Sequence, residues 1–109
     1  MLDELAAKGW QSDRRFAEAY VRSRIARGYG ERSIQEELRQ RGVAPDDQPD
    51  LSSYDWDESI LRVYTKKYGH DLPGSPRERT SRENFLRGRG FSSDSIRHLL
   101  RHLSLSHDA

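Results

Sequence analysis

Residues 13–43 read DRRFAEAYVRSRIARGYGERSIQEELRQRGV. In the first half of this stretch, apolar side chains recur at three- and four-residue spacing, which places them on one face of a helix. These side chains belong to Phe16, Ala17, Tyr20, Val21 and Ile25. Residues 28–30 (GYG) end that helix, and residues 31–41 form a second one that Gly42 can end in a left-handed C-cap. The stretch therefore predicts a helix, a tight turn and a second helix.

The rest of the chain shows three more helical patterns and one irregular segment. Helices are predicted over residues 57–68 and 76–89, and a last one with a leucine-rich apolar stripe is capped near Ser93. Residues 44–47 resemble a helix start with proline in the first turn, but Pro49 removes a backbone donor soon afterwards. We therefore expect only a short or irregular helix there.

The two halves of the sequence share an internal repeat. Residues 38–43 read LRQRGV and residues 86–91 read LRGRGF, with the helix-ending glycine at the same place in both. A short helical unit cannot bury its apolar face alone, so repeated units are expected to stack on one another. The predicted fold class is all-α, with tandem three-helix, helix-turn-helix-like repeats stacked into an elongated domain whose curvature the sequence leaves open.

The repeat divides the chain into four parts. Residues 12–55 are predicted to be a central three-helix repeat, and residues 56–104 the last one. Residues 1–11 are expected to be the end of a first repeat that this sequence mostly lacks, and residues 105–109 a flexible tail.

Charge is unevenly distributed along the chain, although its formal net charge is only +1. Residues 13–42 hold eight arginines against five acidic residues, and residues 43–60 hold acidic residues without a single lysine or arginine. The sign becomes positive again over residues 61–90. Such segregation favours binding to a charged polymer or to a charged protein surface.

The composition argues against several classes of site. The chain lacks cysteine, which excludes disulfides, thiolate metal sites and a cysteine nucleophile. His98 and His102 have the helical spacing of a metal-ligand pair, but no third ligand on a rigid element accompanies them. Neither a nucleophile elbow nor a glycine-rich phosphate loop is present. We therefore expect no catalytic residue, no metal and no cofactor, and without a long apolar run we expect a soluble, cytoplasmic protein with no membrane contact.

Several motifs together resemble the RecX family. Residues 9–17 (GWQSDRRFA), 27–30 (RGYG) and 34–43 (IQEELRQRGV) resemble its central repeat, and residues 67–69 (KYG) and 85–91 (FLRGRGF) resemble its last repeat. The resemblance implies a non-enzymatic protein of tandem three-helix repeats that binds along filaments of the RecA recombinase. It would reduce their ATP hydrolysis and strand exchange, within homologous recombination, DNA repair and the SOS response.

The resemblance also sets the expected partners. The RecA filament is the main one, and single- or double-stranded DNA could be contacted through basic helix faces, with the chain itself expected to be a monomer. The sequence departs from the family pattern at two points. The first repeat is largely missing, and Pro49 stands where the family has a helix.

Eight residues are candidates for contact with the partner or with DNA. They are Arg22, Arg24, Arg27, Tyr29, Arg39, Arg41, Arg87 and Arg89. The arginines of the first two helices are expected to form a basic surface for phosphates or acidic groups. The alternative is a solvated face on which these arginines pair with nearby glutamates. For Arg87 and Arg89, the alternative is a structural role at the end of a helix. Tyr29, between two glycines, is predicted to be exposed, whereas the other aromatic residues are predicted to pack in the core or at turns.

A competing hypothesis is a direct DNA-binding helix-turn-helix protein. Residues 31–41 would then be the recognition helix in the major groove. Its base-reading side chains, such as Gln35 and Arg39, stand among three glutamates that DNA phosphates would repel. The charge pattern of this helix therefore argues against the hypothesis.

Overall fold

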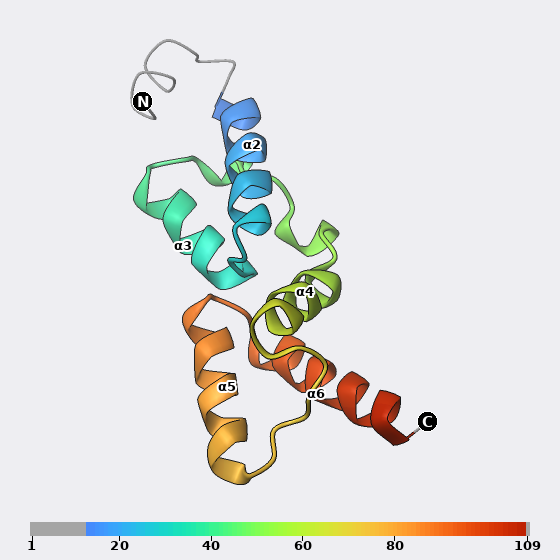
Figure 1. Ribbon diagram of the computed structural model, residues 1–109. Coiled ribbons are helices and arrows are strands. Elements are labelled where there is room, and N and C mark those ends of the chain that lie inside the picture. The colour runs from blue at the N-terminus through green and yellow to red at the C-terminus, as the bar shows by residue number, and fades with distance from the viewer. Residues whose placement is uncertain (1–12, 109) are drawn as a thin grey trace.

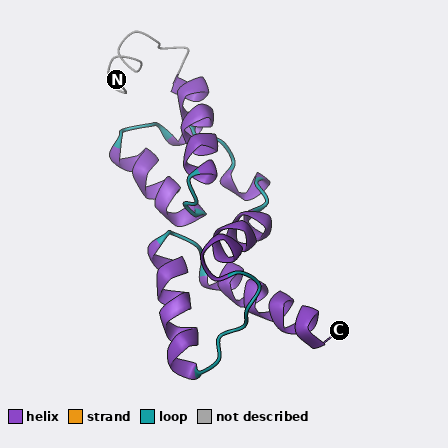
Figure 2. Cartoon of the chain, viewed as in Figure 1, coloured by secondary structure: helices purple, strands orange, loops and turns teal. Residues whose placement is uncertain are grey.

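A computed structural model describes residues 13–108, and every regular element in this range is a helix (Figures 1 and 2). The predicted all-helical class is therefore confirmed for these residues, while the predictions for residues 1–11 lie outside them. The elements in chain order are α2 (Asp13–Ala26), α3 (Glu31–Gln40), the 3-10 helices η1 (Pro45–Asp47) and η2 (Leu51–Ser53), α4 (Trp56–Tyr68), α5 (Pro76–Gly88) and α6 (Ser93–Asp108).

The helices form two units that follow one another along an elongated molecule (Figure 1). The first unit, residues 13–53, consists of α2, α3 and the two 3-10 helices, and the second unit, residues 56–108, consists of α4, α5 and α6. The extents of the molecule are 53 × 24 × 20 Å, which confirms the predicted elongated shape.

The repeated glycine motif forms the same helix end in both units. Gly42 has φ 76° and Gly90 has φ 98°, values that favour glycine. In the first unit the Val43 amide donates to the Leu38 carbonyl (3.1 Å), and in the second the Phe91 amide donates to the equivalent carbonyl of Leu86 (3.2 Å). These are the hydrogen bonds of a Schellman motif, so the internal repeat seen in the sequence is a repeat of structure.

The third helix of the first unit is reduced to η1 and η2, as Pro49 led us to expect. Side chains support this irregular segment: Gln48 Nε2 donates to the Val43 carbonyl (3.0 Å), and the buried Trp56 Nε1 donates to the Leu51 carbonyl (2.6 Å). At the other end of the chain α6 continues to Asp108, so the segment expected to be a flexible tail is helical except for residue 109, which is outside the described range.

One continuous core joins the two units. Its buried apolar residues are Ala17, Val21, Ile34, Leu38, Leu51, Trp56, Ile60, Val63, Tyr64, Leu86, Phe91, Ile96, Leu99, Leu100 and Leu103. The helices α2 and α3 pack on each other in the first unit, while α6 packs on α4 and α5 in the second. Tyr20, Tyr68 and Phe85 pack against this core while partly buried, as predicted for the aromatic residues.

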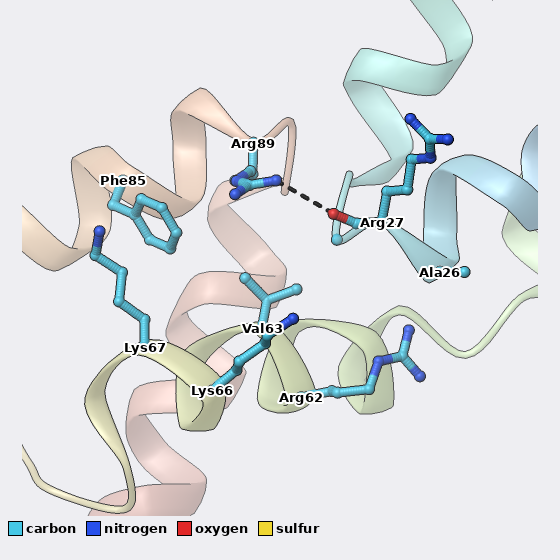
Figure 3. A pocket seen from close by; sticks show the side chains of 9 residues that line it. Ala26, Arg27, Arg62, Val63, Lys66, Lys67, Phe85 and Arg89 are labelled. Atoms are coloured by element: carbon cyan, nitrogen blue, oxygen red, sulfur yellow. Dashed lines mark hydrogen bonds between the residues drawn. The ribbon is translucent and has the colours of Figure 1, made fainter.

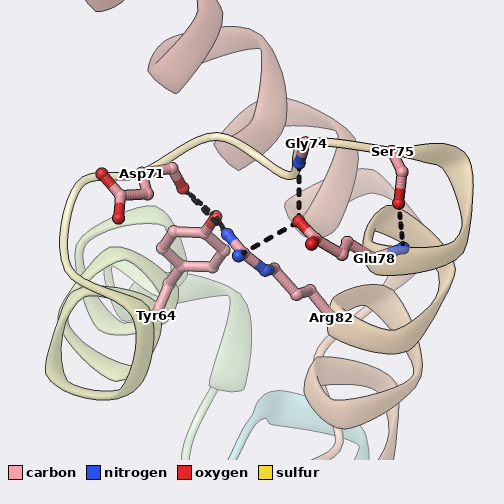
Figure 4. A network of polar contacts seen from close by, with 6 residues as sticks. All are labelled: Tyr64, Asp71, Gly74, Ser75, Glu78 and Arg82. Carbon is pink, nitrogen blue, oxygen red and sulfur yellow. Dashed lines mark hydrogen bonds and ion pairs between the residues drawn. The ribbon is translucent and has the colours of Figure 1, made fainter.

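A polar network around the buried Tyr64 closes the loop between α4 and α5 (Figure 4). The Tyr64 hydroxyl donates to the Asp71 carbonyl and accepts from Arg82 Nη1 at 2.7 Å, and the same guanidinium donates to Asp71 at 3.0 Å. At the start of α5, Ser75 Oγ accepts from the Glu78 amide (3.1 Å). The Ser75 side chain therefore caps the N-terminus of α5.

Candidate functional site

The two units meet end to end, with the N-terminus of α3 against the C-terminus of α5. The Gly30 amide donates to the Arg89 carbonyl (2.7 Å), and the Arg32 amide donates to the Gly90 carbonyl (2.8 Å). Gly30, the N-cap of α3, offers no side-chain cap, so these carbonyls satisfy amides that would otherwise lack a partner in the helix. The contact is possible only without a side chain, because a Cβ on Gly30 would lie 2.5 Å from Gly90 C.

A pocket of about 340 Å³ opens beside this junction, between the end of α2, the middle of α4 and the end of α5 (Figure 3). It is lined by Ala26, Arg27, Gly28, Arg62, Val63, Lys66, Lys67, Phe85 and Arg89. This lining contains basic and apolar side chains and no carboxylate. We refer to it as the junction pocket.

Arg89 is held in the junction pocket by a backbone carbonyl and two aromatic rings. Its Nη1 donates to the Arg27 carbonyl (3.3 Å), and its guanidinium carbon lies 5.1 Å from the centre of the Tyr29 ring and 5.5 Å from that of Phe85. Lys67 Nζ also lies near this ring, 4.3 Å from the centre of Phe85. Contacts of this kind favour the cation over an aromatic face.

The positive charge of the junction pocket is largely uncompensated. Arg62 pairs with Glu58 (3.3 Å), and also donates to the Ile25 carbonyl (3.2 Å). Within the described part of the chain, the other four cations of the pocket, Arg27, Lys66, Lys67 and Arg89, have no carboxylate within salt-bridge distance. In Figure 3 Lys66 points toward the pocket, whereas the guanidinium groups of Arg27 and Arg62 extend outward at its rim.

Tyr29 and Arg24 lie beside this junction, but not as free surface groups. Tyr29 is half-buried, with the Arg24 guanidinium carbon 3.8 Å from its ring centre and Arg89 close to the same ring, so the prediction of an exposed tyrosine is wrong. Arg24 makes two hydrogen bonds of 3.0 Å to the Glu37 carboxylate. Burial disfavours its charged form, but the hydrogen bond and charge of Glu37 outweigh burial and raise the pKa of Arg24.

The remaining candidate arginines lie apart from the junction pocket. Arg22 is exposed on α2, and because residues two apart lie about 200° apart around a helix, it does not share a face with Arg24. Arg39 donates to Glu36 (Nε to Oε1, 3.3 Å), and the hydrogen bond lowers the pKa of the Glu36 carboxyl. Arg41 lies 5.0 Å from the Tyr20 ring centre, and Arg87 donates to Asn84 (3.2 Å).

The structure thus brings together two of the candidate arginines, Arg27 and Arg89, and adds Arg62, Lys66 and Lys67, which the sequence analysis did not select. The basic block over residues 61–90 was the signal for these three residues. It did not indicate which of its cations would face the first unit.

His98 and His102 line a separate, acidic surface between α4 and α6. His98 Nδ1 lies 3.5 Å from Asp57 Oδ2, and both side chains are well exposed. No group of three metal-ligating side chains is found among the described residues. Within the same residues, no helix has the length and apolar character needed to cross a membrane.

Comparison with known proteins identifies the family. A family model described as the second three-helix domain of RecX matches residues 12–48, which contain α2, α3 and η1. The chain is 42% identical over 106 residues to regulatory protein RecX of Chromohalobacter salexigens, covering 94% of this chain and 68% of the relative. It is 42% identical to the RecX of Ectopseudomonas mendocina over 92% of this chain and 69% of the relative. The RecX of Acidithiobacillus ferrooxidans is 34% identical over 91% of this chain and 64% of the relative.

These relatives extend beyond the matched region, since the chain spans about two thirds of their length. They are named as regulatory proteins, in agreement with the expectation that the chain is not an enzyme. The identity extends over more than nine tenths of the chain and therefore includes both helical units. The chain belongs to the RecX family of regulatory proteins.

Proposed function

We propose that this chain binds the RecA filament and lowers its ATP hydrolysis and strand exchange, without catalysis of its own. The observation that carries the proposal is the junction pocket in a member of the RecX family, where four of five cations lack a carboxylate partner among the described residues. A protein filament on DNA presents acidic side chains and phosphates, both of which bind guanidinium and ammonium groups. Such a partner would supply the negative charges that the pocket lacks.

The competing helix-turn-helix hypothesis is not supported by the contacts of α3. Two of its base-reading side chains are engaged within the helix, because Arg39 Nε and Gln40 Nε2 each donate to Glu36 at 3.3 Å. At the start of α3, the end that recognition helices direct at base edges, the Gly30 and Arg32 amides donate to the Arg89 and Gly90 carbonyls. Direct DNA contact, a monomeric state and a cytoplasmic location stay predictions.

The proposal is tested by measuring RecA ATP hydrolysis on single-stranded DNA with increasing amounts of this chain, alongside binding of the chain to the same DNA without RecA. We expect inhibition at concentrations too low for binding to DNA alone. An unchanged ATPase rate, combined with tight and salt-sensitive DNA binding, would instead favour direct DNA binding by this chain.

The same assay can locate the contact surface. The double variant R27E/K66E reverses two exposed cations of the junction pocket, and R77E/R101E makes the same change in net charge at exposed positions that do not line it. We expect only the first variant to lose inhibition. Equal loss in both variants would show that the pocket is not part of the contact.

A further inference from the structure

The junction pocket combines apolar and basic side chains. Its floor is apolar and comes from both units: Ala26 at the end of α2, Val63 on α4 and Phe85 on α5. Val63 is only 9% exposed, so the floor is part of the molecular surface where the core comes close to solvent. A volume of about 340 Å³ lies at the small end of the range for ligand pockets, which is about 300 to 1,000 Å³. The pocket therefore has room for an apolar side chain and the groups next to it.

Cations from three segments of the chain surround this floor. Arg27 directly follows α2, Lys66 and Lys67 lie in the last turn of α4, and Arg89 is the C-cap of α5. The aliphatic parts of lysine and arginine can cover apolar groups while their charged ends stay in solvent. A ligand that suits this arrangement places carboxylates or other anionic groups immediately beside an apolar group.

The aromatic rings near the pocket are poorly placed for stacking with nucleic acid bases. Phe85 has Lys67 Nζ 4.3 Å from its ring centre, and Tyr68 meets it in a T-shaped contact with ring centres 5.9 Å apart. Tyr29 is covered by Arg24 at 3.8 Å. Proteins that bind single strands without sequence preference offer open aromatic faces to successive bases. In this structure those faces are occupied by the protein's own side chains.

Positive charge is compensated in part along the two helices that lead away from the junction, although Arg32, Arg77 and Arg87 have no carboxylate within salt-bridge distance among the described residues. On α5, Arg79 pairs with Glu83 (3.2 Å) and Arg82 with Glu78 (3.7 Å). On α3, Arg39 pairs with Glu36. A nucleic acid backbone needs a series of cations along its path. A short acidic ligand needs only the local group that the junction pocket provides.

From these observations we propose that the junction pocket binds an acidic peptide segment in which an aliphatic or aromatic residue lies beside aspartate or glutamate. The apolar residue rests on the floor formed by Ala26, Val63 and Phe85, and the carboxylates pair with Lys66, Lys67 and the guanidinium groups at the rim. This inference rests on the proposed function in one respect, since it takes the partner that supplies the segment to be a protein. Because both units line the pocket, the bound segment would also bridge them.

The test measures peptide binding by the isolated full chain. A short labelled peptide of aspartate and glutamate with one central phenylalanine is titrated into the ¹⁵N-labelled protein, and amide shifts and fluorescence polarisation are recorded. We expect the largest shifts at Gly28, Val63 and Lys67. Replacing the peptide phenylalanine by serine should weaken binding about tenfold, since burying an aromatic side chain contributes on that order.

Protein variants separate a local site from general charge attraction. R27E/K66E should weaken binding of the peptide by at least about tenfold, because it replaces two attractive contacts with carboxylates by repulsive ones. R77E/R101E, with the same net charge, should bind as the unaltered chain does.

Three results would overturn the inference: equal weakening by the two double variants, peptide-induced shifts outside the pocket, or tighter binding of an oligothymidylate to the same amides. The last result would assign the pocket to nucleic acid. If the chain inhibits RecA and the peptide causes no shift at the pocket, the proposed function stands and this inference fails. If the peptide binds at the pocket and RecA is unaffected, the inference stands and the proposed function fails.

Discussion

Replacing Gly30 by alanine tests how the two units are held together. Gly30 has φ −97°, a value that alanine adopts readily, so the substitution introduces no backbone strain of its own. Its Cβ would nevertheless lie 2.5 Å from Gly90 C and 2.5 Å from Phe91 N. Main-chain atoms cannot rotate away as a flexible side chain can. The first turn of α3 must therefore move away from the end of α5.

The cost of G30A can be worked out from the contact that is lost. Two hydrogen bonds join the units here, from the Gly30 and Arg32 amides, and each contributes about 0.5–1.5 kcal/mol. Their loss is expected to lower the free energy of unfolding by about 1–3 kcal/mol. At about 2 kcal/mol, the thermal midpoint of a domain of this size should fall by roughly 8–16 °C.

The assay is thermal and urea unfolding followed by circular dichroism, with two other glycines as controls. In G88A the new Cβ has no atom within 4 Å, and the midpoint should be unchanged or slightly higher. In G42A the space is equally open but φ is +76°, so only backbone strain of about 1–2 kcal/mol is added. A midpoint for G30A equal to that of G88A would refute the reasoning, because close packing at Gly30 would then contribute nothing to stability.

Three further predictions follow from the polar contacts. In a double-mutant cycle, the half-buried Arg24–Glu37 pair should show a coupling of about 1–2 kcal/mol, whereas the exposed Arg39–Glu36 pair should show a smaller one. The substitution Y64F removes the hydroxyl that contacts both the loop and α5, and should lower the free energy of unfolding in urea titrations by about 1–2 kcal/mol. An unchanged free energy of unfolding would show that the network does not stabilise the fold. Because Arg39 lowers the pKa of Glu36, this pair stabilises the folded chain at pH values above the unfolded-state pKa of Glu36. The stabilisation is lost as the pH falls through the lower pKa that Glu36 has in the folded chain. In R39M an NMR titration should therefore give a higher pKa for Glu36, and an unchanged value would contradict the assignment of Arg39 as the cause.

Much of the fold could be predicted because its signals are local. The apolar spacing fixed the helix faces, and the glycines of the two matching motifs end α3 and α5 with the same hydrogen bonds. Pro49 correctly indicated that no regular third helix forms in the first unit. Each of these signals acts within one or two helical turns, where the neighbouring residues alone determine the backbone.

The junction pocket could not be predicted, because it depends on contacts between distant segments. Arg89 and the Arg27 carbonyl that it contacts are 62 residues apart. Glycines on both sides of Tyr29 suggested exposure, but the guanidinium groups of Arg24 and Arg89 cover its ring. The sequence indicated Gly30 only as part of a turn, whereas in the structure its missing side chain also allows the two units to approach.

The end-to-end meeting of α5 and α3 gives the two ends of α3 different electrostatics. Where the helices join, the partial negative charge of the α5 carbonyls and the partial positive charge of the α3 amides neutralise each other. The partial negative charge at the other end of α3 remains, and Arg39 and Arg41 lie there. Part of their positive charge is thus balanced by the peptide dipoles of their own helix. A polyanion that approaches this end meets a weaker field than the number of arginines suggests.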